Sequence, residues 1–176
     1  MIPSGGAKVL VVKFNDYQCP ACGSSYQQYK PIFAKYVAEH PGAVRVVLKD
    51  FPLNSDCNSN VGRTIHPAAC DAAVAVRLAR QHNRADALED WLYTHQPEMT
   101  GPSVRTAANE KCGVSESEFS DKYASTLDAV KGDVVLGTQL RVTSTPTFFV
   151  NGVKVDGSLP PQYFDQAIAY ELQRAK

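Results

Sequence analysis

Two cysteines separated by two residues, Cys19 and Cys22, are the part of the sequence best suited to covalent chemistry. They follow a β-branched, apolar run at residues 8–14 that predicts a buried strand, and Pro20 suits the first position of a helix. Cys19 therefore lies at the expected helix start, where free backbone N–H groups and the helix dipole stabilise a thiolate. Cys22 lies one turn further on, close enough to attack a mixed disulfide. The alternatives are a static disulfide or half of a zinc site, and the lack of a second C-x-x-C motif disfavours zinc.

A second candidate is the sequence Thr145-Pro146-Thr147, which stands directly before an expected strand. A proline is tolerated at the first residue of a strand, which is the simpler interpretation. The other interpretation is a cis peptide bond before Pro146, which is uncommon and marks a specific tight turn. The strand–CxxC–helix unit upstream and the Asn-Gly hairpin signal at residues 151–152 favour the cis form.

The remaining cysteines are Cys57, Cys70 and Cys112. We predict a structural disulfide between Cys57 and Cys70, because the intervening segment is rich in Asn, Ser, Gly and Pro and a bridge would stabilise it by roughly 3 kcal/mol. A second redox pair that relays electrons is the alternative. A metal site formed with His66 is also conceivable, but only three candidate ligands are present locally. Cys112 is expected to be a buried free thiol that behaves as a small apolar residue.

The elements that must position these residues alternate between strand and helix. Residues 8–14 and 44–48 read as strands that flank an amphipathic helix, which makes a βαβ unit. Residues of about 58–130 read as a helical insertion without strand signals. The chain then returns to a hairpin at 147–155 and closes with an amphipathic helix. The sequence therefore predicts an α/β fold in one domain, residues 1–176.

Composition excludes several classes of protein. The chain has 18 Lys and Arg against 18 Asp and Glu, so its formal charge is zero and it lacks the basic footprint of a nucleic-acid-binding protein. Its apolar runs are far shorter than the roughly 20 residues of a membrane helix. No secretory leader is recognisable, and residues 1–6 have the composition of a linker. The alternative is that this chain is an excised piece of an exported or membrane-tethered protein.

The chain resembles the DsbA-like thioredoxin superfamily of thiol–disulfide oxidoreductases in three segments: FNDYQCPAC at residues 14–22, KDFPL at 49–53 and TSTPTF at 143–148. The resemblance covers nearly the whole chain. It implies a thioredoxin-like fold with a helical insertion subdomain and a cis proline, Pro146, packed beside the cysteine pair. The segment at residues 51–70 is similar to DsbA-like domains fused to, or working with, bacterial vitamin K epoxide reductase homologues.

The resemblance also implies a role for each residue of the site. Cys19 would be the exposed nucleophile and Cys22 the resolving thiol. Thr145, together with Pro20 and Ala21 between the two cysteines, would contact an extended substrate.

Two positions depart from the family pattern, and a third is a candidate substitute for a missing acid. The family commonly has a buried acid six residues before the first cysteine, and here Lys13 occupies that position. Lys13 could transfer protons only if desolvation lowers its pKa, and Asp16 is a candidate substitute. Ala21 stands where the strongest oxidants of the family carry histidine. This leaves the reduction potential open between about −120 mV, as in DsbA, and about −270 mV, as in thioredoxin.

The predicted function is a protein dithiol oxidase that introduces disulfides into exported proteins through Cys19 and Cys22. The expected partners are reduced protein substrates and a membrane quinone-coupled thiol oxidase, either DsbB-like or vitamin-K-epoxide-reductase-like. The expected location is periplasmic or otherwise extracytoplasmic, with no organic cofactor and no metal. The alternatives are a disulfide reductase or isomerase, a non-catalytic module stabilised by cysteines, and a metal-binding module.

Overall fold

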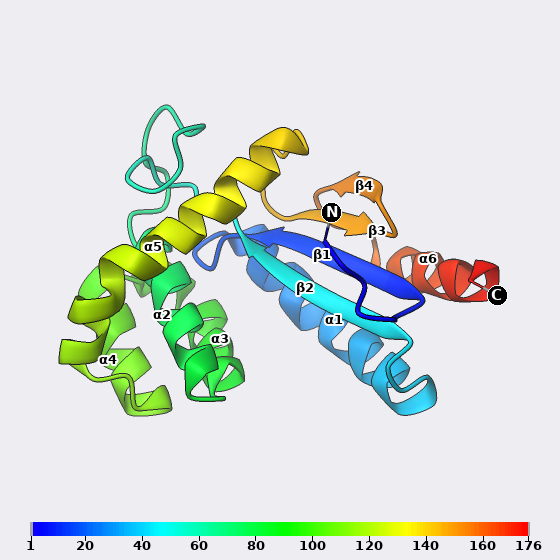
Figure 1. Ribbon diagram of the computed structural model, residues 1–176, viewed down its shortest axis with the longest axis horizontal. Helices are drawn as coiled ribbons and strands as arrows, with labels where there is room; N and C mark the ends of the chain where they lie inside the picture. Colours follow the sequence, from blue (N-terminus) through cyan, green and yellow to red (C-terminus); the bar gives the residue numbers. More distant parts are fainter. Residues whose placement is uncertain (1, 176) are drawn as a thin grey trace.

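The computed structural model describes residues 2–175 and contains a four-stranded mixed sheet with helices on both faces (Figure 1). The strands are β1 (Val9–Asn15), β2 (Val44–Asp50), β3 (Thr147–Val150) and β4 (Val153–Asp156). The helices are α1 (Pro20–Glu39), α2 (Ala69–Gln81), α3 (Ala85–Thr94), the short 3-10 helix η1 (Gln96–Glu98), α4 (Gly101–Cys112), α5 (Glu116–Gln139) and α6 (Pro161–Arg174). The predicted α/β class is thereby confirmed.

The strand order is β2-β1-β3-β4, so both ends of the chain contribute to one sheet. β1 pairs in parallel with β2 through the α1 crossover and antiparallel with β3, which continues into β4 through the Asn151-Gly152 turn. The register places Phe14 opposite Thr147, the first residue of β3. This pairing brings the loop before β3 to the end of β1, where the cysteine motif begins.

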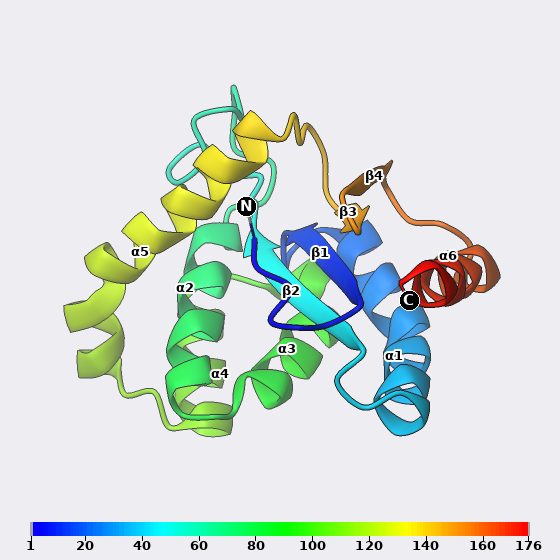
Figure 2. The same ribbon diagram turned by 45° about the vertical axis from the view of Figure 1, so that its right-hand side comes forward.

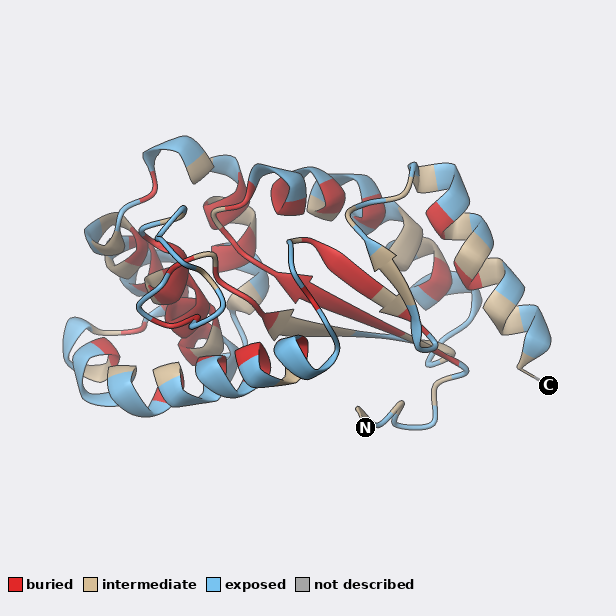
Figure 3. Cartoon of the chain, turned by 90° about the horizontal axis from the view of Figure 1, so that it is seen from above, coloured by how far each residue is buried: buried red, intermediate tan, exposed pale blue. Residues whose placement is uncertain are grey.

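Alternating side chains of β1 pack against two different layers. Val9 and Val11 belong to the core formed with α1 and α6, whereas Val12 and Phe14 belong to the core under α5. Viewed from above, β1 is buried along its length, with α1 on one side of the sheet and α5 on the other (Figure 3). The central strand therefore holds the cysteine motif at a rigid position between two cores.

The helical insertion lies to one side of the sheet (Figure 2). Its helices share a core with the cysteine motif, and α2 contributes seven buried residues to it. Its bounds differ from the predicted 58–130. Residues 58–68 form a loop, because side chains such as Asn58 and Thr64 bond to nearby backbone and side chains, which competes with helix formation. At the other end α5 continues to Gln139, well beyond residue 130.

Helix α5 can approach the sheet because it carries a glycine at the contact. A Cβ added at Gly137 would lie 2.7 Å from the ring of Phe51 and 3.1 Å from that of Phe14. A second glycine of the same helix, Gly132, has nothing within 4 Å of the equivalent position. The close approach of α5 to the end of β1 therefore depends on Gly137.

Charged groups link the insertion to the sheet next to this contact. Arg77 of α2 binds Asp50 at the end of β2 (Nε to Oδ2, 2.6 Å) and also Asp133 of α5. Lys49 adds a second cation to Asp133 at 2.7 Å. Burial raises the pKa of Asp50, and the Arg77 charge opposes that shift. These pairs fix the insertion relative to the strand that precedes the disulfide loop.

Within residues 2–175, none of the helices has both the length and the apolar character required to span a bilayer.

Candidate active site

The cysteine motif lies at the junction of β1 and α1. Cys19 is the N-cap of α1, and its carbonyl oxygen accepts the first bonds of the helix from the N–H groups of Cys22 (3.0 Å) and Gly23 (3.1 Å). Both cysteines carry free thiols in this structure. Cys19 is only 6% exposed, which is less than the resemblance implied, and Cys22 is 0% exposed. Pro20 and Ala21 are exposed, so this turn presents its middle residues to the outside.

The loop before β3 covers Cys19 and explains its low exposure. The Thr145–Pro146 peptide bond is cis, and Pro146 is buried. The Cys19 thiol donates to the carbonyl oxygen of Thr145 at 3.4 Å. The Thr145 hydroxyl is buried and has no hydrogen-bond partner within the described residues, so it is free to donate to a sulfur anion. The loop therefore offers polar groups where a disulfide partner must approach Cys19.

The pKa values of the two thiols move in opposite directions. The pKa of Cys19 falls from an ordinary value of 9.0 to about 5, chiefly because the Cys22 thiol donates a hydrogen bond to its sulfur. The neighbouring Thr145 side chain and the backbone N–H of Cys22 also lower the pKa of Cys19, against burial and the charge of Asp16. Burial raises the pKa of Cys22 well above its ordinary value. The pair therefore has one thiolate nucleophile and one protected thiol.

Lys13 lies behind this pair on β1 and is 5% exposed. Its Nζ donates to the carbonyl oxygen of Cys22 at 3.2 Å and lies 5.5 Å from the ring centre of Tyr93 and 5.8 Å from that of Phe148. Burial lowers the pKa of Lys13, and the negative charges of Cys22 and Glu89 oppose that shift. A cavity of about 490 Å³ between α1, β2 and α3 is lined by both Lys13 and Glu89. Lys13 thus has a neighbouring thiol and an opening through which protons could pass.

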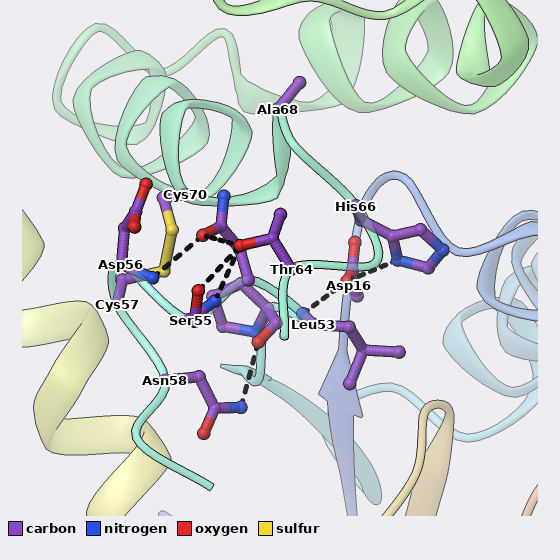
Figure 4. The surroundings of a disulfide bond; sticks show 12 residues. Asp16, Leu53, Ser55, Asp56, Cys57, Asn58, Thr64, His66, Ala68 and Cys70 are labelled. Carbon is purple, nitrogen blue, oxygen red and sulfur yellow. Dashed lines mark hydrogen bonds and ion pairs between the residues drawn. A yellow bond between two sulfur atoms is a disulfide. The ribbon is translucent and has the colours of Figure 1, made fainter. Parts of the chain in front are cut away.

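The Asp16 carboxylate makes hydrogen bonds to the disulfide loop and to the backbone of Gln18, and none to either cysteine. It accepts the N–H of Gln18 (2.7 Å) and the N–H of Leu53 (2.7 Å), and it pairs with Nδ1 of His66 at 2.8 Å (Figure 4). Only its backbone N–H reaches Cys22, 3.5 Å from the sulfur. The structure therefore places the Lys13 ammonium, rather than the Asp16 carboxylate, beside the buried cysteine.

Cys57 and Cys70 are joined by a disulfide with an S–S distance of 2.07 Å and a Cα–Cα distance of 6.1 Å (Figure 4). The bond ties the loop after β2 to the first turn of α2. His66 lies between them in sequence but pairs with Asp16, so these three side chains do not converge as metal ligands. Among residues 2–175 no cluster of three or more His, Cys, Asp or Glu is arranged to hold a metal.

Cys112 lies at the end of α4, far along the chain from the motif. Its thiol is buried, donates to the carbonyl oxygen of Arg84 at 3.2 Å and has a pKa raised by burial. Burial and a raised pKa are typical of an unreactive thiol.

Two contributors to the site were not predicted from the sequence. One is His66, described above. The other is Gln96 of η1, whose Nε2 donates to the carbonyl oxygens of Cys19 (2.7 Å) and Tyr17 (2.8 Å). Its side chain also fills the space next to Gly23, where an added Cβ would lie 2.7 Å from Oε1. The insertion therefore fixes the backbone of the motif. Nothing in the sequence around Gln96 indicated this contact.

A shallow hollow adjoins the cis-proline loop on the side of the disulfide loop. It has a volume of about 610 Å³, and its lining includes Leu53, Val61, Ile65, Ser144 and Thr145. Mixed apolar and backbone groups of this kind suit an extended peptide.

Comparison with known proteins agrees with this geometry. A family model described as Thioredoxin matches residues 4–169. The Na(+)/H(+) antiporter NhaA 3 of Salinispora tropica is 29% identical over 153 residues, which cover 86% of this chain and 21% of the antiporter. The NhaA 1 antiporter of Salinispora arenicola is also 29% identical, over 154 residues. The chain spans about a fifth of the length of these curated relatives.

Among solved structures, alpha-DsbA1 of Wolbachia pipientis superposes with a TM-score of 0.75 at 15% identity and covers 97% of this chain and 88% of its own. BdbD of Bacillus subtilis gives a TM-score of 0.72 at 20% identity, with 96% and 89% covered. The fold and the free Cys19–Cys22 pair beside the cis proline together define a thioredoxin-like domain with a Cys-x-x-Cys motif. The chain belongs to the thioredoxin family. The predicted thioredoxin-like fold and family resemblance are confirmed; the association with vitamin K epoxide reductase homologues stays a prediction.

Proposed function

We propose that the protein oxidises dithiols of reduced, unfolded proteins outside the cytoplasm, through a disulfide between Cys19 and Cys22. The observation that carries this direction is the pKa of Cys19, lowered to about 5. A thiolate stabilised in the reduced form makes the disulfide form a stronger oxidant, because the pair gains free energy when it accepts electrons. The exposed turn at Pro20 and Ala21 and the groups offered by Thr145 support contact with an extended substrate.

The reaction proceeds by two exchanges. A substrate thiolate attacks the Cys19 sulfur, the Cys19–Cys22 bond breaks, and its electron pair passes to the Cys22 sulfur, which takes up a proton. A second substrate thiolate then attacks the substrate sulfur of the mixed disulfide. That bond breaks, the substrate disulfide forms, and Cys19 leaves as a thiolate. The substrate has lost two electrons, and the cysteine pair has gained them.

We assign the proton transfer at Cys22 to Lys13. Its ammonium group lies beside the backbone of Cys22, its charge favours the Cys22 thiolate, and burial eases its loss of a proton. Lys13→Met should slow formation of the mixed disulfide from the oxidised pair in stopped-flow exchange, with Lys30→Met, at an exposed ion pair, as the matched control. Equal rates for the two variants would remove Lys13 from this role.

The decisive experiment is the reduction potential of the Cys19–Cys22 pair in glutathione buffers, followed by oxidation of a reduced, unfolded protein. We expect a potential well above the thioredoxin value of about −270 mV, and disulfide formation that is lost in Cys19→Ser. A potential near −270 mV, with faster reduction than oxidation of substrates, would instead identify a reductase. Scrambled disulfides rearranged without net oxidation would identify an isomerase.

Reoxidation requires an electron acceptor, for which we propose a membrane quinone-coupled thiol oxidase of the DsbB or vitamin K epoxide reductase type. The similarity of residues 51–70 to domains that work with the latter supports this choice, and the matched antiporters carry a similar unit within a membrane protein. Vesicles containing either oxidase and quinone should reoxidise the reduced protein. Failure with both vesicle types would exclude these partners.

A further inference from the structure

His66 and Asp16 form an ion pair directly behind the cysteine motif. Nδ1 of His66 lies 2.8 Å from Oδ2 of Asp16, whose side chain is fully buried, while that of His66 is 16% exposed (Figure 4). The two residues come from the end of β1 and from the disulfide loop, 50 positions apart. The two residues between the cysteines, Pro20 and Ala21, carry no ionisable group. Any charge that tunes the thiols must therefore come from elsewhere in the fold.

Asp16 contacts the motif through its backbone: its carbonyl oxygen accepts the N–H of Cys19 at 3.2 Å, and its N–H contacts the Cys22 sulfur. Its carboxylate accepts the N–H of Gln18, the residue before Cys19, at 2.7 Å. Its negative charge opposes the thiolate and raises the pKa of Cys19. A cation held on Asp16 would cancel this effect. The only side-chain partner that the carboxylate has within the described residues is His66.

The loop is built to hold His66 at that position. The N–H groups of Ile65 and His66 both donate to the carbonyl oxygen of Leu53, at 2.9 and 3.1 Å. The N–H of Leu53 donates to the same Asp16 oxygen that binds the imidazole. Carboxylate, loop backbone and imidazole therefore form a closed set of hydrogen bonds, which is independent of the Cys57–Cys70 bridge.

Charge favours the imidazolium form of His66 in this setting. The hydrogen bond to Asp16 raises the pKa of His66, and the negative charge of Cys19 acts in the same direction, while burial opposes both. The titratable groups that act on His66 are thus Asp16 and Cys19, and those that act on Cys19 are Cys22 and Asp16.

We propose that His66 is a positioning residue of the redox site, whose imidazolium neutralises Asp16 and thereby stabilises the Cys19 thiolate. The proposal rests on the proposed function, because it assigns His66 a part in setting the oxidising strength of that pair. His66, in the disulfide loop, supplies the positive charge that the Cys-Pro-Ala-Cys turn lacks.

Linkage between the two groups gives a test that requires no mutation. If protonated His66 stabilises the Cys19 thiolate, then the thiolate must raise the pKa of His66 by the same amount. Proton NMR titration of the imidazoles should therefore show a higher His66 pKa in the reduced protein than in the oxidised one. His82, paired with Glu118 in the insertion, is the internal control, and its ring resonances should be the same in the reduced and oxidised proteins. An unchanged His66 would overturn the proposal.

Substitution tests the path through Asp16. His66→Gln retains a hydrogen-bond donor without charge and should raise the pKa of Cys19 by about one unit, because a neighbouring charge shifts a pKa by roughly 1–3 units at contact. A rise of one unit is a tenfold change in the acid dissociation constant of Cys19, which corresponds to a reduction potential lower by about 30 mV. His82→Gln should change neither quantity.

In an Asp16→Asn background the effect of His66→Gln should disappear, since the charge to be neutralised is gone. The same shift in both backgrounds would mean that His66 acts on Cys19 directly and would refute the path through Asp16. Should Asp16→Asn not fold, the NMR titration alone decides. A wild-type pair that does not exchange with glutathione would refute the proposed function, whereas normal exchange with identical Cys19 pKa values in wild type and His66→Gln would refute only this inference.

Discussion

The Cys22 thiol should control the acidity of Cys19, and two substitutions at Cys22 isolate this effect. Its hydrogen bond is the largest cause of the lowered Cys19 pKa. Cys22→Ala removes the donor, whereas Cys22→Ser keeps a hydroxyl donor at the same position. Both variants lack the resolving thiol, so they differ only in the hydrogen bond to Cys19 and should trap the same mixed disulfides.

The size of the effect follows from the charge on the acceptor. A hydrogen bond to a charged group contributes about 1.5–3 kcal/mol, and one pKa unit corresponds to about 1.36 kcal/mol. The pKa of Cys19 in Cys22→Ala should therefore lie about one to two units above that in Cys22→Ser. At about pH 6 the alanine variant should contain several-fold less thiolate and should be alkylated correspondingly more slowly.

Thiolate ultraviolet absorbance against pH measures the pKa, and the pH dependence of iodoacetamide alkylation provides an independent value. The other free thiol of the described chain, Cys112, is buried with a raised pKa and does not contribute in this range. Cys19 pKa values that differ by only a few tenths of a unit between the two variants would refute the reasoning. It would show that Thr145 and the helix start stabilise the anion without Cys22.

Three further outcomes are expected. The low Cys19 pKa means that the unfolded chain binds more protons than the folded one between about pH 5 and 9, so the stability of the reduced protein should rise with pH over this interval; denaturant titrations should show no such rise for the oxidised form. Replacing Cys57 and Cys70 together by Ser should lower stability by about 3 kcal/mol and leave turnover of a simple disulfide nearly unchanged; intact stability with failed reoxidation by the membrane partner would instead indicate a relay. Gly137→Ala should destabilise by about 1–3 kcal/mol because of overpacking, whereas Gly132→Ala faces open space and should not; equal urea midpoints would contradict the packing argument.

Periodicity predicted most of the fold because it acts locally. The ends of the helices are also determined locally: Thr100 caps α4, Gly113 ends it with a φ of 75°, and Ser115 caps α5 through the N–H of Glu118. The helices of the insertion span residues 69–139 rather than the predicted 58–130 or so. Residues 58–68 form a loop that is held by a disulfide and by the Asn54 side chain, which binds the backbone carbonyl of Pro67, and α5 extends because it packs on the sheet through Gly137.

The site likewise contains residues that local sequence signals predicted and contacts between residues far apart in the sequence that they did not. Cys19, Cys22 and Pro146 belong to short motifs whose neighbours in sequence indicate their surroundings. The pairing of His66 with Asp16 depends on a loop that returns to the end of β1 after 50 residues, and no periodicity encodes that return. The low exposure of Cys19 likewise depends on the Thr145 loop, which lies 126 positions away.

The contrast between the two thiols is therefore a property of the complete fold. Cys19 and Cys22 are one helical turn apart, yet one pKa is lowered and the other raised. Cys22 is buried in the core that the insertion forms with the motif, while Cys19 gains donors from its own helix and from Thr145 near the other end of the chain. Since none of these contacts exists in an unfolded chain, both thiols should have ordinary, equal reactivity until β3 pairs with β1. Selective alkylation of Cys19 is thus a direct measure of folding, and its loss should coincide with global unfolding in denaturant.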